Sequence, residues 1–387
     1  MRFTLFFLSL LELGNAVLLP KPSGPYGVAL KVHAMTDNHR IDPYDPKHGK
    51  RQVLASIFWP VHEDSCSKKK AAYMPPATAE VYGKQAEQMG LSKDTFKAFE
   101  MEVCVVSTSS ECKIQSNGKK QKFPLAIFSP GAGNSRLLYS AMARSLASYG
   151  NVVVLIDHPY DAVIVELPDG TVVQGGNIPE DTASLEKLTQ SWKVRAKDIS
   201  FVISQIQRPS FQRKVFKGLP GAIDDKKIVT LGHSLGGASA AAAILSDPRI
   251  RSGINLDGRL FDPVLSKGLD KPFMLLGRPN HRSEDTTWVK FWKGLRNAKV
   301  ELEVSGAVHG SFTDFPLLIS VLGLPEAAKK QAAPLFGSVD GIVLQKLISE
   351  TLTGFMNYSF GGSSTSLQKT IMGSKELSVV KSQLPAH

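Results

Sequence analysis

The chain has 387 residues, of which 42% are hydrophobic and 21% are charged, and its formal net charge is +11. These values are typical of a globular protein with a large core and exclude a disordered or fibrous chain. The basic residues are scattered apart from Lys68–Lys70 and a group at 119–122, which we interpret as solvated loops and not as a nucleic-acid site. The positive balance also fits peripheral contact with an anionic or zwitterionic lipid surface.

The first residues resemble a secretory signal. Arg2 precedes an apolar run, Phe3–Leu11, that is too short to span a bilayer, and residues 14–16 form a small-x-small cleavage site. No later run is long and apolar enough for a transmembrane helix. We therefore expect residues 1–16 to be removed, the mature chain to begin near Val17, and the protein to be secreted, extracellular and soluble.

Secretion affects the interpretation of the three cysteines, because two of them are expected to pair in an oxidising compartment. Cys66 would pair with either Cys104 or Cys112. No CxxC or histidine partner pattern accompanies them, so we expect neither a metal site nor a cofactor. Asn357 begins the sequon Asn-Tyr-Ser and is a candidate glycosylation site.

In the first half of the chain, the sequence pattern predicts strands that lead into a loop rich in glycine and proline. Two strands near the N-terminus, 27–35 and 51–60, are expected to pair antiparallel, and an insertion with short helices around 77–100 follows at 61–115. The next predicted elements are a strand at 123–128, the loop at 129–134, a helix at 135–149 and a fully apolar strand at 151–156.

The second half alternates strands with helices. We expect a hairpin at 162–180 that turns at Pro168-Asp169-Gly170, strands at 227–230, 250–256, 272–277 and 299–305, and helices at 181–207, 288–295 and 340–356. This order predicts an α/β fold with a mostly parallel sheet of about eight strands and helices on both faces. We assign residues 17–360 to a single domain and residues 361–387 to a loosely held tail.

The turn between the strand at 227–230 and the alanine-rich helix at 240–245 contains Gly232-His233-Ser234-Leu235-Gly236. This is the Gly-x-Ser-x-Gly nucleophile elbow of α/β-hydrolases, in which a strained turn lifts the serine hydroxyl above the sheet. Glycines stand two residues before and after the serine because strand and helix pass too close there for a Cβ. The pattern predicts Ser234 as a nucleophile.

A serine hydroxyl needs a base within hydrogen-bond reach and an acid that orients that base. In this fold both follow the serine, the acid first. Among the nine histidines, His309 alone lies in a loop directly after the last predicted strand, so it is the expected base. Asp257, directly after a strand, is favoured as the acid over Asp285 in a longer polar loop. His233 is adjacent to the serine, and we assign it to local packing.

The oxyanion formed on attack needs two backbone N–H donors. One is expected from Leu235, which follows the nucleophile, and the other from Ala132 in the glycine-rich loop, with Gly133 as the second choice. His158 follows a strand end but precedes the serine. For His158 a structural role and a place in the substrate pocket remain equally open.

These motifs together resemble the platelet-activating factor acetylhydrolases, the group VII phospholipases A2, over residues 25–358. The segments that carry the resemblance are residues 128–133, 138–140, 146–150, 157–161, 232–238, 254–258, 309–315 and 337–340. The resemblance implies calcium-independent hydrolysis of short or oxidised sn-2 acyl chains of phospholipids, with Asp257 as the acid. Pro130 stands where the family has histidine, and Leu235 where it has an aromatic residue, and both positions are implied to line the acyl pocket.

Three functional hypotheses follow. The first is a secreted serine esterase that acts on phospholipids or other short-acyl esters and resembles the secreted fungal members. The second is a cutinase- or polyesterase-like enzyme, and the third is a non-catalytic lipid-binding effector on a hydrolase fold. The apolar run at 315–324 is interpreted as a buried helix in preference to a lipid-contact surface. The sequence leaves the oligomeric state open.

Overall fold

The structure is a computed structural model that describes residues 16–106, 121–175 and 185–385. The predicted signal segment apart from residue 16, the third cysteine at position 112 and the expected start of the helix at 181 lie outside these residues. None of the described helices has the length and apolar character needed to cross a bilayer.

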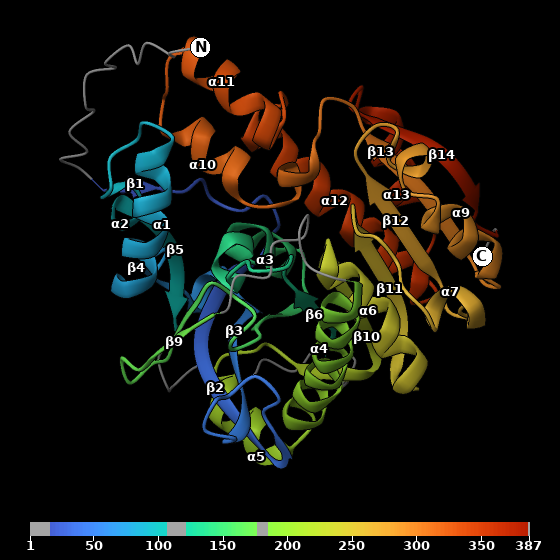
Figure 1. Ribbon diagram of the computed structural model, residues 1–387, viewed down its shortest axis with the longest axis horizontal. Coiled ribbons are helices and arrows are strands. Elements are labelled where there is room, and N and C mark those ends of the chain that lie inside the picture. Colours follow the sequence, from blue (N-terminus) through green and yellow to red (C-terminus); the bar gives the residue numbers. More distant parts are fainter. Residues whose placement is uncertain (1–15, 107–120, 176–184, 386–387) are drawn as a thin grey trace.

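Within the described residues, twelve strands form one mixed sheet, and most neighbouring strands run parallel. Figure 1 shows this sheet across the molecule. In spatial order its strands are β1 (Val17–Leu18), β5 (Phe99–Val105), β2 (Gly27–Ile41), β3 (Lys50–Val61), β7 (Val152–Asp157), β6 (Lys122–Ser129), β10 (Ala222–His233), β11 (Ile250–Leu256), β12 (Phe273–Gly277), β13 (Lys299–Val304) and β14 (Leu377–Gln383), with β4 (Ser67–Ala72) paired to β5. A separate hairpin contains β8 (Ile164–Glu166) and β9 (Val172–Gln174), as predicted.

Helices flank the sheet. The α-helices are α1 (Pro76–Gln88), α2 (Thr95–Ala98), α3 (Ser140–Ser148), α4 (Leu185–Ile206), α5 (Pro209–Val215), α6 (Leu235–Ser246), α7 (Val264–Lys267), α8 (His281–Glu284), α9 (Thr287–Gly294), α10 (Phe315–Val321), α11 (Glu326–Phe336), α12 (Gly341–Ser359) and α13 (Thr365–Gly373). The 3₁₀ turns are η1 (Glu63–Ser65), η2 (Arg136–Tyr139) and η3 (His309–Phe312).

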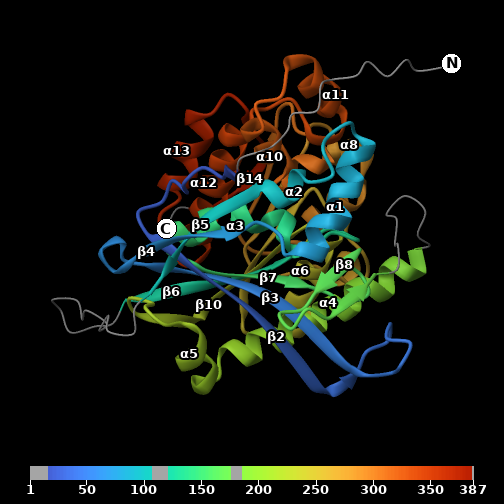
Figure 2. The ribbon, with the colours of Figure 1, turned by 90° about the vertical axis from the view of Figure 1, so that its left-hand side faces the viewer.

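The central strands are buried on both faces, and alternate side chains enter two different cores. Ala126 and Phe128 of β6 belong to the core that α1, α3, α10 and α12 also enter, whereas Leu125 and Ile127 belong to the core that includes α4, α5, α6 and α9. Figure 2 shows the sheet between α3 and α12 on one side and α4 and α5 on the other. This arrangement confirms the predicted α/β class, because helices cover both faces of a mostly parallel sheet.

The structure corrects three expectations. The sheet has twelve strands where about eight were expected, because both ends of the chain and the segment at 61–115 add strands to it. That segment contains the expected short helices, α1 and α2, but its strands β4 and β5 also belong to the central sheet. The tail is not loose either: β14 pairs antiparallel with β13, and Leu367 of α13 is fully buried.

Two further expectations are settled by the described residues. Cys66 is bonded to Cys104, which lies on β5, so the first of the two predicted pairings is confirmed. The apolar run at 315–324 begins with α10, in which Leu317 and Leu318 are 2% exposed. One face of this helix is buried, as predicted, whereas Phe315, Ile319 and Val321 are partly exposed.

Candidate active site

Ser234 occupies a strained turn between β10 and α6. Its φ and ψ are 55° and −124°, in a region that residues with a side chain seldom adopt. A Cβ on Gly236 would lie 1.9 Å from the Ser129 carbonyl oxygen, and one on Gly232 would lie 2.4 Å from the Gly236 backbone. Strand, loop and helix therefore approach as closely as the elbow pattern predicts.

The register of the sheet places the candidate acid beside this turn. His233 is paired with Leu256 across β10 and β11, and the Ser234 N–H donates to the Leu256 carbonyl at 2.9 Å. The next residue, Asp257, leaves the sheet at the same edge with a positive φ of 54°. Because β10 and β11 are parallel, their carboxyl ends present Ser234 and Asp257 side by side.

The candidate base reaches this edge from η3, directly after β13. His309 Nδ1 lies 2.7 Å from Asp257 Oδ2, so the imidazole donates its Nδ1 proton to the carboxylate. This tautomer leaves Nε2 as the basic nitrogen. The His309 side chain is 43% exposed, whereas that of Asp257 is fully buried, which is suitable for a base that meets substrate and an acid that orients it.

Asp257 has further partners that keep it ionised. His281 Nδ1 lies 2.8 Å from Asp257 Oδ1, and the backbone N–H of Arg278 donates to the same oxygen at 2.9 Å. Burial would raise the pKa of Asp257, but the hydrogen bonds from His281 and His309 outweigh it and hold that pKa well below its usual value. The alternative acid, Asp285, instead lies 3.5 Å from His281 Nε2.

The loop after β6 is held against the elbow by a hydrogen-bonded chain. Tyr139 Oη accepts from the Gly131 N–H at 3.0 Å and from the Asn134 amide at 2.9 Å. Its own proton is then available to His233 Nδ1, 2.9 Å away, and His233 Nε2 donates to the His309 carbonyl at 3.0 Å. His233 therefore links the glycine-rich loop to the candidate base, which goes beyond the local packing assigned to it from the sequence.

The predicted oxyanion donors belong to the elbow and to the loop that lies against it. Leu235 is the first residue of α6 and is 4% exposed, and Ala132 is partly buried in the loop after β6. Pro130 is buried at the start of that loop. No group of three or more His, Cys, Asp or Glu side chains in the described ranges is arranged to hold a metal ion.

His158 does not line an open pocket. It is 2% exposed, its Nε2 lies 3.0 Å from Ser129 Oγ, and its Nδ1 lies 2.8 Å from Asp198 Oδ2. Burial lowers the pKa of His158, so the ring is neutral, donates through Nδ1 and accepts from Ser129 through Nε2. Of its two possible roles, the structure supports the structural one.

Comparison with known proteins gives the family. The model for "Platelet-activating factor acetylhydrolase, isoform II" matches residues 13–167 and 198–360. The chain belongs to the platelet-activating factor acetylhydrolase family. A probable 1-alkyl-2-acetylglycerophosphocholine esterase of Arthroderma benhamiae is 30% identical over 90% of this chain and 89% of its own length. The platelet-activating factor acetylhydrolase of Cavia porcellus is 28% identical over 62% of this chain and 58% of its own.

A solved structure extends the likeness to the fold. The ferulic acid esterase from Streptomyces cinnamoneus has a TM-score of 0.73 and 26% sequence identity, and the match covers 94% of this chain and 99% of that one. This platelet-activating factor acetylhydrolase family member therefore has the predicted α/β-hydrolase fold. Its relatives and this neighbour are named as esterases or acetylhydrolases, and the chain is accordingly a carboxylic ester hydrolase.

Proposed function

We propose that the protein is a secreted serine esterase that hydrolyses short sn-2 acyl esters of phospholipids. The observation that carries this proposal is the 2.7 Å bond between His309 Nδ1 and Asp257 Oδ2 at the sheet edge where the strained Ser234 turn lies. The substrate class is supported by the 1-alkyl-2-acetylglycerophosphocholine esterase that is 30% identical to this chain.

In the proposed reaction, Ser234 Oγ bonds to the acyl carbon as its proton passes to His309 Nε2. The negative charge moves to the carbonyl oxygen, which the Leu235 and Ala132 N–H groups stabilise. His309 then gives the proton to the departing glycerol oxygen, and the acyl group remains on Ser234. A water molecule repeats the sequence, so that a carboxylic acid leaves and the serine is restored. Asp257 orients His309 throughout and stabilises its charged form.

Secretion is supported by the disulfide between Cys66 and Cys104, since such bonds persist in oxidising compartments. Asn357 is exposed on α12, so its sequon is open to glycosylation in a secreted chain. We propose peripheral contact with lipid surfaces for the same enzyme, because its substrate resides there. Its pocket is proposed to include Pro130 and Leu235.

The structural neighbour favours a second candidate. A ferulic acid esterase matches nearly the whole chain, so an enzyme for other carboxylic esters, including the polymers of a cutinase- or polyesterase-like enzyme, is the alternative. A non-catalytic lipid-binding protein is the third hypothesis. The three candidates predict different activities for the purified protein: hydrolysis of short-acyl phospholipids, hydrolysis of other carboxylic esters, or no hydrolysis.

The test compares wild type with Ser234→Ala on four substrates: 1-alkyl-2-acetylglycerophosphocholine, a long-chain sn-2 phosphatidylcholine, methyl ferulate and a polyester film. We expect acetate release from the first to exceed the other rates and to fall by a factor of at least about 10⁴ in Ser234→Ala. The control is Ser239→Ala, which removes a hydroxyl one turn further along α6 that donates to the Leu235 carbonyl at 2.7 Å. Activity of Ser234→Ala near that of wild type would overturn the proposal, and preferential turnover of ferulate or polymer would favour the second candidate.

A further inference from the structure

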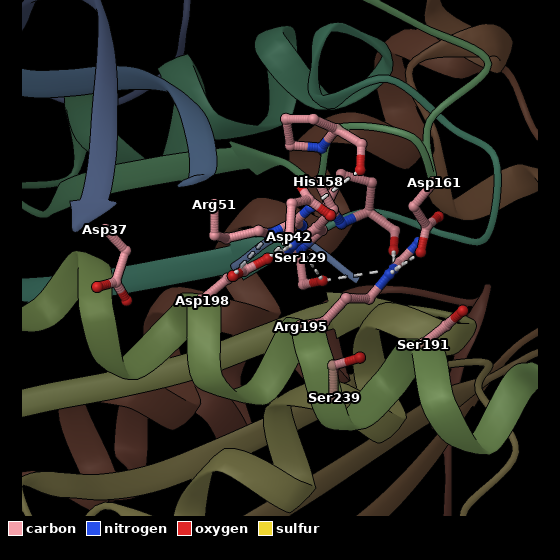
Figure 3. Close-up of polar contacts among 12 residues, drawn as sticks. Asp37, Asp42, Arg51, Ser129, His158, Asp161, Ser191, Arg195, Asp198 and Ser239 are labelled. Atoms are coloured by element: carbon pink, nitrogen blue, oxygen red, sulfur yellow. Dashed lines mark hydrogen bonds and ion pairs between the residues drawn. The ribbon is translucent and has the colours of Figure 1, made fainter. Parts of the chain in front are cut away.

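A buried arginine on α4 contacts the backbone of the glycine-rich loop. Arg195 of α4 donates through Nη1 to the Pro130 carbonyl at 2.5 Å and through Nη2 to the Gly131 carbonyl at 3.2 Å. Its side chain is 1% exposed, and its Nε donates to Asp161 Oδ2 at 2.8 Å. Figure 3 shows the guanidinium between α4 and the loop. One planar group thus binds two successive backbone carbonyls and is itself oriented by a carboxylate.

The geometry of the peptide bond makes this contact relevant to catalysis. In a trans peptide the C=O and the N–H of the same unit point in opposite directions. The Pro130 carbonyl faces Arg195, and the N–H of the same unit, on Gly131, faces Tyr139 at 3.0 Å on the other side of the loop. That other side is the side of the candidate base, because Tyr139 is linked through His233 to the His309 carbonyl.

The next peptide unit joins Gly131 to Ala132. Its carbonyl also faces Arg195, so its N–H, which belongs to Ala132, is directed away from α4. We propose that Arg195 is a positioning residue for the oxyanion hole, which it orients by holding the Pro130 and Gly131 carbonyls on the α4 side of the loop. This inference rests on the proposed function, in which the Ala132 N–H stabilises the oxyanion.

The ion pair with Asp161 restrains the position of the Arg195 guanidinium. Burial would raise the pKa of Asp161, but Arg195 outweighs this effect and lowers it, so the pair is ionic. Asp161 Oδ1 also lies 3.4 Å from the Gly133 N–H, so the same carboxylate contacts the loop and the arginine. A donor that is already aligned costs no reorganisation when charge develops, which is the condition for effective oxyanion stabilisation. A cationic donor on the Gly131 carbonyl also polarises the Ala132 N–H.

A second buried arginine in the same polar cluster provides the matched control. Arg51 is also 1% exposed, and it binds Asp198 at 2.6 Å and Asp42 at 2.8 Å. Its backbone acceptor is Pro159, at 3.0 Å, and not the loop at 130–134. Loss of Arg51 also removes a buried arginine from the cluster in Figure 3, but it leaves the contacts of Arg195 to the Pro130 and Gly131 carbonyls in place.

The experiment compares the double variants R195M/D161N and R51M/D42N with wild type. Each removes an arginine together with the charge of a carboxylate partner, because a buried carboxylate left without its arginine is strongly destabilising. In R51M/D42N the second partner of Arg51, Asp198, keeps its ion pair with Arg40 at 2.8 Å. We measure kcat and KM for 4-nitrophenyl acetate, the inhibition constant of a trifluoromethyl ketone, and the thermal midpoint. The ketone forms a tetrahedral oxyanion with an active serine and therefore reports the oxyanion hole directly.

For R195M/D161N we expect kcat to fall on the order of 10²-fold, the size of effect of a lost oxyanion donor, with KM changed by less than about threefold. The inhibition constant of the ketone should rise in proportion to the fall in kcat. R51M/D42N should keep kcat within about threefold of wild type despite a lowered thermal midpoint. The conservative variant R195K keeps the charge but not the planar fork, so it should show a smaller fall of the same kind.

A folded R195M/D161N with unchanged kcat, or with a change in KM alone, would overturn the inference, and so would an equal loss of kcat in R51M/D42N. If R195M/D161N does not fold, R195K decides: unchanged ketone inhibition, or failure of this variant to fold as well, would assign Arg195 to folding alone. Wild type without esterase activity, or activity retained in Ser234→Ala, would instead refute the proposed function and this inference with it. If only the role of Arg195 is refuted, hydrolysis that depends on Ser234 is still observed.

Discussion

At the scale of single residues, Asp257 determines how the site is ordered. It accepts from His309 on one oxygen and from His281 and the Arg278 backbone on the other. Asp285 is linked to this site only through His281: it lies 3.5 Å from Nε2 of that ring, whose Nδ1 contacts Asp257. The two carboxylates that sequence alone had to choose between therefore belong to one chain of contacts, but Asp257 is the one that touches His309.

This order predicts unequal effects of two amide substitutions. Asp257→Asn should lower kcat by a factor of about 10³–10⁴, because the amide no longer enforces the Nδ1–H tautomer of His309. Asp285→Asn should lower kcat by less than about tenfold, since it alters His281 and not His309. Steady-state hydrolysis of a short-chain ester measures both, and a larger loss in Asp285→Asn would contradict the assignment.

The residues predicted from the sequence share a local signal that Arg195 and Tyr139 lack. Ser234, Asp257 and His309 each follow a strand and have a glycine within two positions, so the fold class alone places them at one edge. Arg195 lies in the middle of a long helix, where an arginine indicates a solvated face, and its carbonyl partners are 64 and 65 positions away. Such a contact becomes visible only when α4 is packed against the sheet.

At the scale of elements, the segment between the first strands and the glycine-rich loop adds β4 and β5 to the central sheet. Phe99 and Met101 of β5 are each 1% exposed, in the alternation of a half-buried strand. The lysines of β4 were interpreted as a solvated loop, but they form an exposed edge strand. Charged side chains on an edge strand oppose pairing with a second chain. Composition alone does not separate this use of lysine from a loop.

The disulfide ties β5 to the start of β4, which leads to a prediction on stability. The two cysteines are separated by 38 positions, so the chain-entropy estimate for their bond is about 3–4 kcal/mol. Replacing Cys66 and Cys104 by serine should lower the free energy of unfolding by about that amount, measured by urea unfolding of the oxidised protein. Cys112→Ser is the control and should have little effect. Equal stabilities of the double variant and wild type would contradict the prediction.

At the scale of the whole molecule, groups far apart in the chain meet at the carboxyl ends of neighbouring parallel strands. The loop after β6, the turn after β10, Asp257 after β11 and η3 after β13 lie along one edge of the sheet, because β6, β10, β11, β12 and β13 are consecutive neighbours. Alternation of strands and helices was sufficient to predict this edge. The strands added at both ends of the sheet were not predictable in the same way, because their pairing depends on contacts between distant segments.

The central claim is that Ser234 is the nucleophile, and covalent labelling tests it most directly. Wild-type protein is treated with a fluorophosphonate, digested and mapped by mass spectrometry, with Ser234→Ala and Ser239→Ala treated in parallel. We expect one adduct per chain, located on Ser234, with a parallel loss of esterase activity, and we expect it in Ser239→Ala but not in Ser234→Ala. An adduct on another residue, or full activity in a protein that carries the adduct on Ser234, would contradict the account.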